Sequence, residues 1–166
     1  MKKKLTIGSA VYDDFDGIYP EEVRPMAFTH FTPIEIAIRA AKFLVQKSGT
    51  KVLDIGSGAG KFCMIGSVCT NGHFTGVEQR DNLHLLAEQI FKKYQLKNIN
   101  FINSNINQIE FNNYEAFYFF NPFYENIIQF EKIKLEWKEG PLTFNEEMKH
   151  HTAIVYKVIS KDLILV

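Results

Sequence analysis

The chain has 166 residues, of which 46% are hydrophobic and 14% aromatic, enough for the core of one domain. Lysine plus arginine and aspartate plus glutamate each number 19, so the net charge is zero. This balance excludes a chain-wide attraction to nucleic acid or to an acidic membrane, although a local basic patch stays open. No apolar run is long enough for a membrane span. The two cysteines lack zinc-site spacing, which indicates reduced thiols, a cytoplasmic protein and no metal.

Strands and helices alternate along the chain. Thr32, Pro33 and Glu35 form a capping-box pattern that predicts the start of a helix, and Gly49 is expected to end it. Further apolar patterns predict parallel strands at residues 51–55, 73–78, 98–102 and 116–120, with one helix after residue 60 and another that Asp81 caps.

The C-terminal part continues the alternation. A second capping-box pattern, at residues 143–146, predicts a helix that reaches Ile159, and residues 162–166 predict a fifth strand. Residues 131–142 read as an inserted segment. Together the elements predict one α/β domain, residues 1–166, with a doubly wound, mainly parallel, Rossmann-like sheet.

A glycine-rich turn follows the first predicted strand, in the sequence VLDIGSGAGK at residues 52–61. Asp54 precedes three glycines, Gly56, Gly58 and Gly60, in the pattern GxGxG. Glycine lets the backbone come close to a ligand, and the following helix offers free N–H groups to a carboxylate. Because ligands of such sheets bind beyond the carboxyl ends of the strands, the turn predicts a cofactor site. A tight turn without a ligand is the alternative.

Two familiar phosphate-binding templates fit the turn less well. Phe62 stands where a Walker loop needs serine or threonine, and Lys61 stands where a dinucleotide fingerprint needs its third glycine. Glu78 ends the second predicted strand, at the position where an acid binds ribose hydroxyls in nucleoside-binding α/β folds. An exposed acid or a partner of Arg80 is the alternative for Glu78.

These motifs, together with the sequence Asn-Pro-Phe-Tyr at residues 121–124, resemble the class I S-adenosylmethionine-dependent methyltransferases over about residues 30 to 130. The resemblance implies S-adenosyl-L-methionine as cofactor. Asn105 stands where the family has an acid that contacts adenine. The residues that the resemblance assigns to the cofactor are Asp54, Gly56, Ser57, Gly58, Gly60, Glu78, Gln79, Asn105 and Asn121.

The Asn-Pro-Phe-Tyr sequence is similar to the (N/D)PP(Y/F) signature of nitrogen-directed methyltransferases, with Phe123 in place of the second proline. The resemblance implies catalytic roles for Asn121, Pro122, Phe123 and Tyr124. Asn121 and the carbonyl of Pro122 would accept hydrogen bonds from an NH2 group on which Tyr124 stacks. Such acceptors orient a nitrogen lone pair and stabilise its developing charge. A plain turn after a strand is the alternative for this motif.

We therefore expect an enzyme that methylates a nitrogen of a protein side chain or a small molecule. The glycine turn and Glu78 are also similar to the non-SET histone-lysine methyltransferases, which keeps a protein amine open as acceptor. A nucleic-acid base is less favoured because no arginine-rich run marks such a surface. A nucleoside- or NAD-binding oxidoreductase and a non-catalytic cofactor-binding module are the alternative functions.

Both ends of the sequence carry a further expectation. Residues 1–31 read as an N-terminal extension that could form a lid over the cofactor, with His30 and Phe31 as lid residues or, alternatively, as core residues. Class I methyltransferases usually end in an antiparallel hairpin, whereas this sequence stops at Val166 on the fifth predicted strand. We expect that apolar edge to be covered by further chain or by a second copy in a homo-oligomer.

Overall fold

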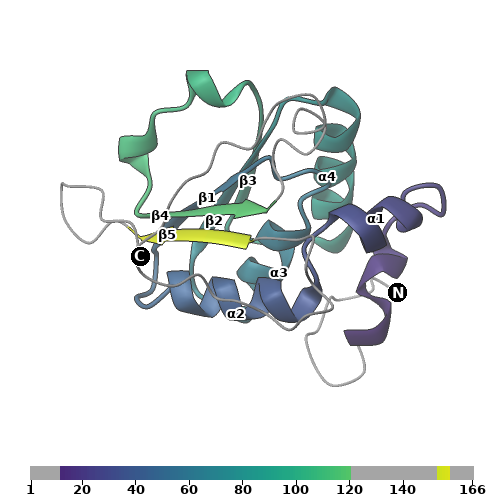
Figure 1. Cartoon of the computed structure of the whole chain (residues 1–166), viewed down its shortest axis with the longest axis horizontal. Coiled ribbons are helices and arrows are strands. Elements are labelled where there is room, and N and C mark those ends of the chain that lie inside the picture. The colour runs from purple at the N-terminus through teal and green to yellow at the C-terminus, as the bar shows by residue number, and fades with distance from the viewer. Residues whose placement is uncertain (1–11, 121–152, 158–166) are drawn as a thin grey trace, which may run out of the picture.

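The computed structural model describes residues 12–120 and 153–157 (Figure 1). Its helical elements are η1 Tyr12–Ile18, α1 Arg24–His30, α2 Ile34–Leu44, α3 Lys61–Cys69, α4 Asp81–Tyr94, η2 Ile106–Gln108 and η3 Phe111–Asn113, of which the η elements are 3-10 turns. The strands are β1 Lys51–Ile55, β2 His73–Glu78, β3 Ile99–Asn103, β4 Ala116–Phe120 and β5 Ala153–Lys157. Among these helices, none combines the length and apolar character that crossing a membrane requires.

The strands form one sheet in the order β3-β2-β1-β4-β5. The first four are parallel, and β5 pairs antiparallel with β4. The chain winds from β1 outward to β3 and then crosses back to β4 on the other side of β1, so the winding reverses between β1 and β4. The predicted doubly wound, mainly parallel, Rossmann-like sheet is thus confirmed.

Two apolar layers cover the sheet. The larger core lies between one face and the helices α2, α3 and α4, and it contains Ala41, Ile65, Phe74, Ala87 and Tyr118. The smaller core lies on the opposite face, where Ile106 and Ile109 from the η2 segment pack against buried strand residues. Figure 1 shows α2 and α3 below the sheet and the η2–η3 segment above it.

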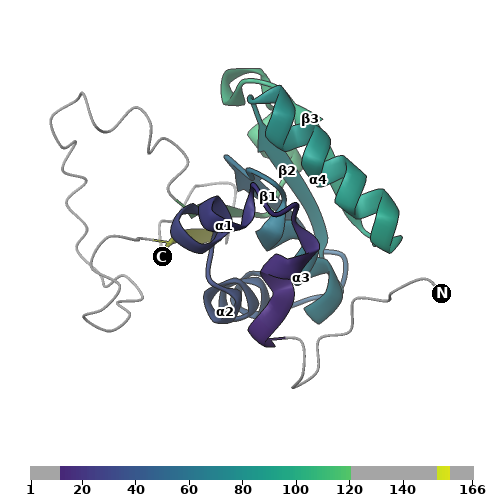
Figure 2. The ribbon, with the colours of Figure 1, turned by 90° about the vertical axis from the view of Figure 1, so that its right-hand side faces the viewer.

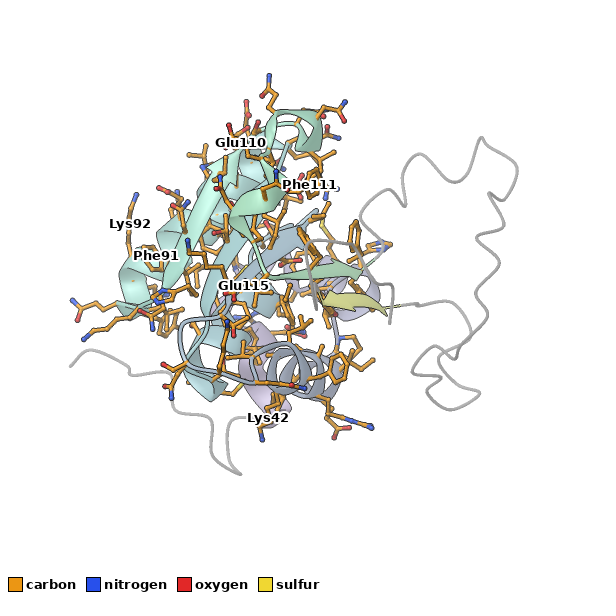
Figure 3. The ribbon with its side chains drawn as sticks, turned by 90° about the vertical axis from the view of Figure 1, so that its left-hand side faces the viewer. Lys42, Phe91, Lys92, Glu110, Phe111 and Glu115 are labelled. Carbon is orange, nitrogen blue, oxygen red and sulfur yellow. The ribbon has the colours of Figure 1, made fainter. Side chains whose placement is uncertain are left out.

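The two ends of the parallel strands differ in character. Glu115 lies at the amino end of β4, where its carboxylate pairs with the Lys47 ammonium at 2.7 Å and accepts the backbone N–H of Lys51. Figure 3 views this end of the sheet, with Glu115 near the centre. Figure 2 views the opposite, carboxyl end, where α1 lies in front of the sheet beside β1.

The strand predictions agree closely with the structure. The predicted bounds of β1, β2 and β4 are confirmed, and β3 begins and ends one residue later than expected. The helix predicted through residues 143–159 is wrong at residues 153–157, which form β5. Ile154, Val155 and Tyr156 favour a strand, and β4 would otherwise be an apolar edge. The segments predicted at 131–142 and 162–166 lie outside the described residues.

The capping box predicted for α2 does not form. The helix begins at Ile34 with Pro33 as its N-cap residue, and no side chain caps it. Thr32 is instead 5% exposed, and its hydroxyl oxygen accepts a hydrogen bond from the Tyr118 hydroxyl at 3.0 Å. The prediction failed because a buried partner on a distant strand competes for the same hydroxyl.

Two other helix boundaries were also predicted wrongly. The helix α2 ends at Leu44, before Gly49, although Gly49 does adopt the left-handed conformation at φ +80°. Asp81 is the first residue of α4 and does not cap it. Its carboxylate accepts a hydrogen bond from the side-chain amide of Asn103, which ties α4 to the end of β3.

Candidate active site

A cavity of about 400 Å³ lies at the carboxyl ends of the parallel strands. This volume is within the range of small-molecule sites in proteins. The cavity spans the neighbouring strands β1 and β4, where the winding of the sheet reverses, as expected for an α/β fold. It is lined by Met26, His30, Phe31, Thr32, Asp54, Gly56, Ser57, Gly58, Lys61, Phe62, Arg80, Leu83 and Phe120.

The glycine turn forms the floor of this cavity and is fixed to β2. The backbone N–H groups of Gly56 and Ser57 both donate to the carbonyl oxygen of Val77, at 2.9 and 3.0 Å. Gly60 has φ +79°, and a Cβ there would lie 2.5 Å from the ring of Phe101. Gly60 is therefore required both by its backbone conformation and by the close approach of β3.

Phe31 lies directly over the turn. A Cβ on Gly58 would meet its ring at 3.6 Å, and Gly58 also has a positive φ of 55°. Phe31 packs edge-on against Tyr19, whose hydroxyl donates to the carbonyl oxygen of Ala59 at 3.4 Å. The N-terminal segment thus contacts the glycine turn through two aromatic residues.

Asp54 is a buried carboxylic acid in the cavity wall. Its side chain is 3% exposed, and the Cys63 thiol donates a hydrogen bond to its Oδ2 atom at 3.5 Å. Burial raises the pKa of Asp54 to about 7, the thiol opposes this, and the charge of Glu78 adds to it. A cationic ligand group beside Asp54 would favour its ionised form.

Glu78 carries four hydrogen bonds on its two carboxylate oxygens. Oε1 accepts from the backbone N–H of Arg80 and from its Nε, at 2.9 and 2.8 Å. Oε2 accepts from the backbone N–H of Gly58 and from Nη2 of Arg80, at 2.9 and 3.0 Å. Burial alone would raise the pKa of Glu78, but these bonds outweigh it and hold the pKa below its ordinary value. The ion pair of Glu78 with Arg80, which the sequence offered as an alternative, is therefore present.

Three other expected cofactor residues lie around the same strand ends. The Ser57 hydroxyl oxygen is buried without a hydrogen-bond partner in the described part of the chain, so it fits a ligand with a polar group. Asn105 follows β3, and its side-chain amide donates to the Gln79 side chain at 3.4 Å. Asn105 and Gln79 are both exposed and do not line the cavity.

The predicted catalytic residues Asn121, Pro122, Phe123 and Tyr124 lie outside the described residues. Phe120, the last residue of β4, is 7% exposed and lines the cavity. The strand that leads into the predicted catalytic sequence therefore ends at the cavity.

Residues 46–135 match the model of a protein family described as a methyltransferase domain, and this stretch is more than half of the chain. The chain belongs to this methyltransferase family. Membership implies S-adenosyl-L-methionine as the cofactor, in agreement with the expectation from the sequence.

A curated relative of this chain is the tRNA (guanine-N(7)-)-methyltransferase of Prochlorococcus marinus (strain NATL2A), 30% identical over 89 residues. The match covers 52% of this chain and 41% of the relative, so it spans less than half of that protein.

Two solved structures that this chain resembles are methyltransferases by name. The precorrin-6y C5,15-methyltransferase of Geobacter metallireducens GS-15 is 11% identical with a TM-score of 0.44, over 52% of this chain and 62% of that one. A methyltransferase of Thiobacillus denitrificans in complex with S-adenosyl-L-homocysteine is 22% identical with a TM-score of 0.41, over 52% and 37%.

The sequence did not reveal the contacts of several residues in the cavity wall. Phe62 stacks on Tyr118 at a ring-centroid distance of 3.7 Å, and Tyr118 binds Thr32. The Lys61 ammonium pairs with the Asp16 carboxylate at 2.7 Å. Only the position of Lys61 directly after three glycines could have drawn attention to it, since the other contacts join distant parts of the chain.

Proposed function

We propose that this methyltransferase transfers the methyl group of S-adenosyl-L-methionine to a nitrogen atom of a protein side chain or a small molecule. The observation that carries the proposal is the cavity between the ends of β1 and β4, where Asp54 and the glycine turn meet the strand that leads to Asn121. One strand end serves the cofactor and its neighbour serves the acceptor.

The charges at the cavity support an amino-acid-bearing nucleoside as cofactor. Asp54 binds the ammonium group of its methionine end, and the N–H groups at the start of α3 with the Ser57 hydroxyl face its polar atoms. Glu78 binds the ribose hydroxyls once the Arg80 guanidinium releases the two carboxylate oxygens of Glu78. Gln79 and Asn105 lie farther along the strand ends, on the side assigned to the adenine ring. The bound cofactor supplies an electrophilic methyl group.

The acceptor side is assigned to residues 121–124. Asn121 and the carbonyl of Pro122 accept hydrogen bonds from the acceptor nitrogen, and Tyr124 stacks on the planar or amino group that carries it. Pro122 has no N–H and so adds an acceptor without a competing donor. Phe123 stands where the signature has its second proline. These residues act by orientation and by stabilising positive charge on the nitrogen.

A nucleic-acid base is the second candidate acceptor. The curated relative from Prochlorococcus marinus is named for guanine-N7 of tRNA, which is also a nitrogen. Against this candidate stands the zero net charge of the whole chain, because binding to a phosphate backbone normally needs a basic surface.

Two measurements test the proposal. Calorimetric titration with S-adenosyl-L-homocysteine and with NAD should show saturable binding of the first alone, and the reverse result would favour an oxidoreductase. Transfer of tritiated methyl groups into a host lysate, fractionated into protein, RNA, DNA and metabolites, should label the protein or metabolite fraction.

Asn121→Ala is the matched control for the transfer assay. We expect it to lower labelling strongly while the affinity for S-adenosyl-L-homocysteine changes little, because Asn121 acts chiefly on the acceptor. Labelling by both proteins that does not exceed the lysate without added protein would support a non-catalytic cofactor-binding module, whereas equal labelling above that background would contradict the proposed role of Asn121.

A further inference from the structure

Lys61 is a buried cation in the wall of the cofactor cavity. Its side chain is 5% exposed, and its ammonium pairs with Asp16 at 2.7 Å and lies 5.9 Å from the ring centre of Phe15. We propose that the ammonium of Lys61 forms a binding site for the carboxylate of the amino-acid end of the cofactor. This inference rests on the proposed function, and it adds a specificity residue to it.

The position of Lys61 is unfavourable for a cation unless an anion is present. Lys61 is the first residue of α3, where the helix dipole and the free N–H groups already favour negative charge. Burial lowers the pKa of the Lys61 amine, and only the pairing with Asp16 opposes this. The Lys61 ammonium and the N-terminus of α3 together form a positive region, and Asp16 is the acidic residue that pairs with it.

The opposite charge lies on the other side of the glycine turn. Asp54 precedes the turn at the end of β1, Lys61 follows it at the start of α3, and both line the same cavity. The methionine end of the cofactor carries one ammonium and one carboxylate on the same carbon atom. A carboxylate at Asp54 and an ammonium at Lys61 therefore match both charges of that end.

The Ser57 hydroxyl supports the same assignment. It lies between Asp54 and Lys61 in the turn, and it is buried with no partner in the described residues. A carboxylate accepts hydrogen bonds from a hydroxyl, an ammonium and backbone N–H groups, which are the donors that this turn presents. A ligand without an acceptor group at this place would leave these donors unused.

The test compares two ligands that differ only by the amino-acid end. S-adenosyl-L-homocysteine carries the carboxylate, whereas 5′-methylthioadenosine lacks it, and the affinity of the full chain for each is measured by calorimetry. Lys61→Met keeps the apolar length of the side chain and removes its charge. We expect it to weaken binding of S-adenosyl-L-homocysteine about 10- to 100-fold and to leave binding of 5′-methylthioadenosine unchanged. Lys61→Gln is the second variant if Lys61→Met does not fold.

Asp16→Asn separates ligand binding from a purely structural role. It removes the partner of Lys61 but keeps the ammonium, so the inference predicts that S-adenosyl-L-homocysteine binds at least as tightly as to the wild type. If Lys61→Met and Asp16→Asn both weakened the binding of the two ligands to the same extent, Lys61 would only hold the N-terminal segment in place through Asp16. That result would overturn the inference. Unchanged binding of both ligands in Lys61→Met would also overturn it. Failure of the wild-type chain to bind either ligand would instead overturn the proposed function itself.

Discussion

Arg80 occupies both carboxylate oxygens of Glu78. A carboxylate offers about four lone-pair positions, and Arg80 and Gly58 fill four of them in this structure. Glu78 is 3% exposed and does not line the cavity, whereas Arg80 does. A ribose that binds Glu78 must therefore displace hydrogen bonds that Arg80 makes, which gives the arginine the role of a competing internal ligand.

We expect Arg80→Ala to tighten the binding of S-adenosyl-L-homocysteine several-fold, because the ribose hydroxyls would no longer compete with the guanidinium. Without ligand the variant should be less stable by about 2 kcal/mol, since the buried carboxylate loses charged hydrogen bonds. Calorimetry gives the affinity and urea denaturation gives the stability. Lys92→Ala, which removes an exposed pair with Glu88 on α4, is the control and should change neither. Weaker ligand binding in Arg80→Ala would mean that Arg80 itself holds the cofactor.

Binding of the cofactor should depend on pH through Asp54. Its pKa is raised to about 7, so the carboxylate that we propose to bind the cofactor ammonium is only partly ionised at neutral pH. Affinity for S-adenosyl-L-homocysteine should rise between pH 6 and pH 8 by roughly tenfold if the group titrates as a single site. Asp54→Asn should bind weakly at every pH. The neighbouring groups are the charged Glu78 carboxylate and the neutral Cys63 thiol, and an unchanged profile in Asp54→Asn would assign the titration to another group.

The same shift predicts how folding stability depends on pH. The folded-state pKa of Asp54 lies above its unfolded value, so the favourable contribution is complete below about pH 4 and is lost as the pH rises to about 7. The loss is roughly 4 kcal/mol for a shift of this size. Asp54→Asn, which cannot ionise, should therefore stabilise the protein at pH 8 relative to the wild type and do so much less at pH 4. Denaturation curves at the two pH values give the comparison, and equal effects at both would contradict it.

A double-mutant cycle can test whether the Thr32 hydroxyl binds Tyr118 and does not cap α2. Tyr118→Phe should cost about 1–2 kcal/mol of unfolding free energy, because the buried Thr32 hydroxyl loses its donor. Thr32→Val should cost a similar amount, and the double variant should be more stable than the sum predicts. Strict additivity in urea denaturation would show that the two hydroxyls act separately and that Thr32 serves α2 in another way.

Two glycines with the same backbone conformation allow the cost of backbone strain to be measured apart from the cost of side-chain crowding. Gly60 and Gly49 have φ values of +79° and +80°, but a Cβ on Gly60 would lie 2.5 Å from Phe101, whereas a Cβ on Gly49 would meet nothing within 4 Å. Gly49→Ala should cost about 1–2 kcal/mol from backbone strain alone. Gly60→Ala should cost at least about 2 kcal/mol more because β3 must shift. Thermal denaturation of the two variants gives the difference, and equal costs would show that Phe101 adapts freely.

The sequence predicted the parts of the fold that local patterns determine. Apolar runs gave β1, β2 and β4 with their bounds, and three glycines located the turn, because each signal lies within a few residues. Thr32, Asp81 and residues 153–157 were predicted wrongly because their hydrogen-bond partners, Tyr118, Asn103 and β4, lie far away in the sequence.

The candidate site was predictable in outline for the same reason. Asp54, Gly56, Ser57 and Gly58 line the cavity, since they belong to one continuous motif, whereas Gly60 of the same motif does not. The pairings of Glu78 with Arg80 and of Lys61 with Asp16 determine which charges are available to a ligand, and side-chain geometry decides them. No spacing rule in the sequence distinguishes a free acid from one that a neighbour already holds.

The antiparallel strand β5 has one more consequence. Its first residue, Ala153, pairs with Phe120, the last residue of β4, so β4 ends and β5 begins at the same place in the sheet. That place borders the cavity through Phe120. Phe120 and Ala153, the two residues between which residues 121–152 stand in the sequence, therefore both lie at the cavity end of the sheet. Because the acceptor site that we propose begins at Asn121, an exchange of residues 121–152 for those of a relative should change the methyl acceptor and leave Asp54 and the glycine turn unaltered.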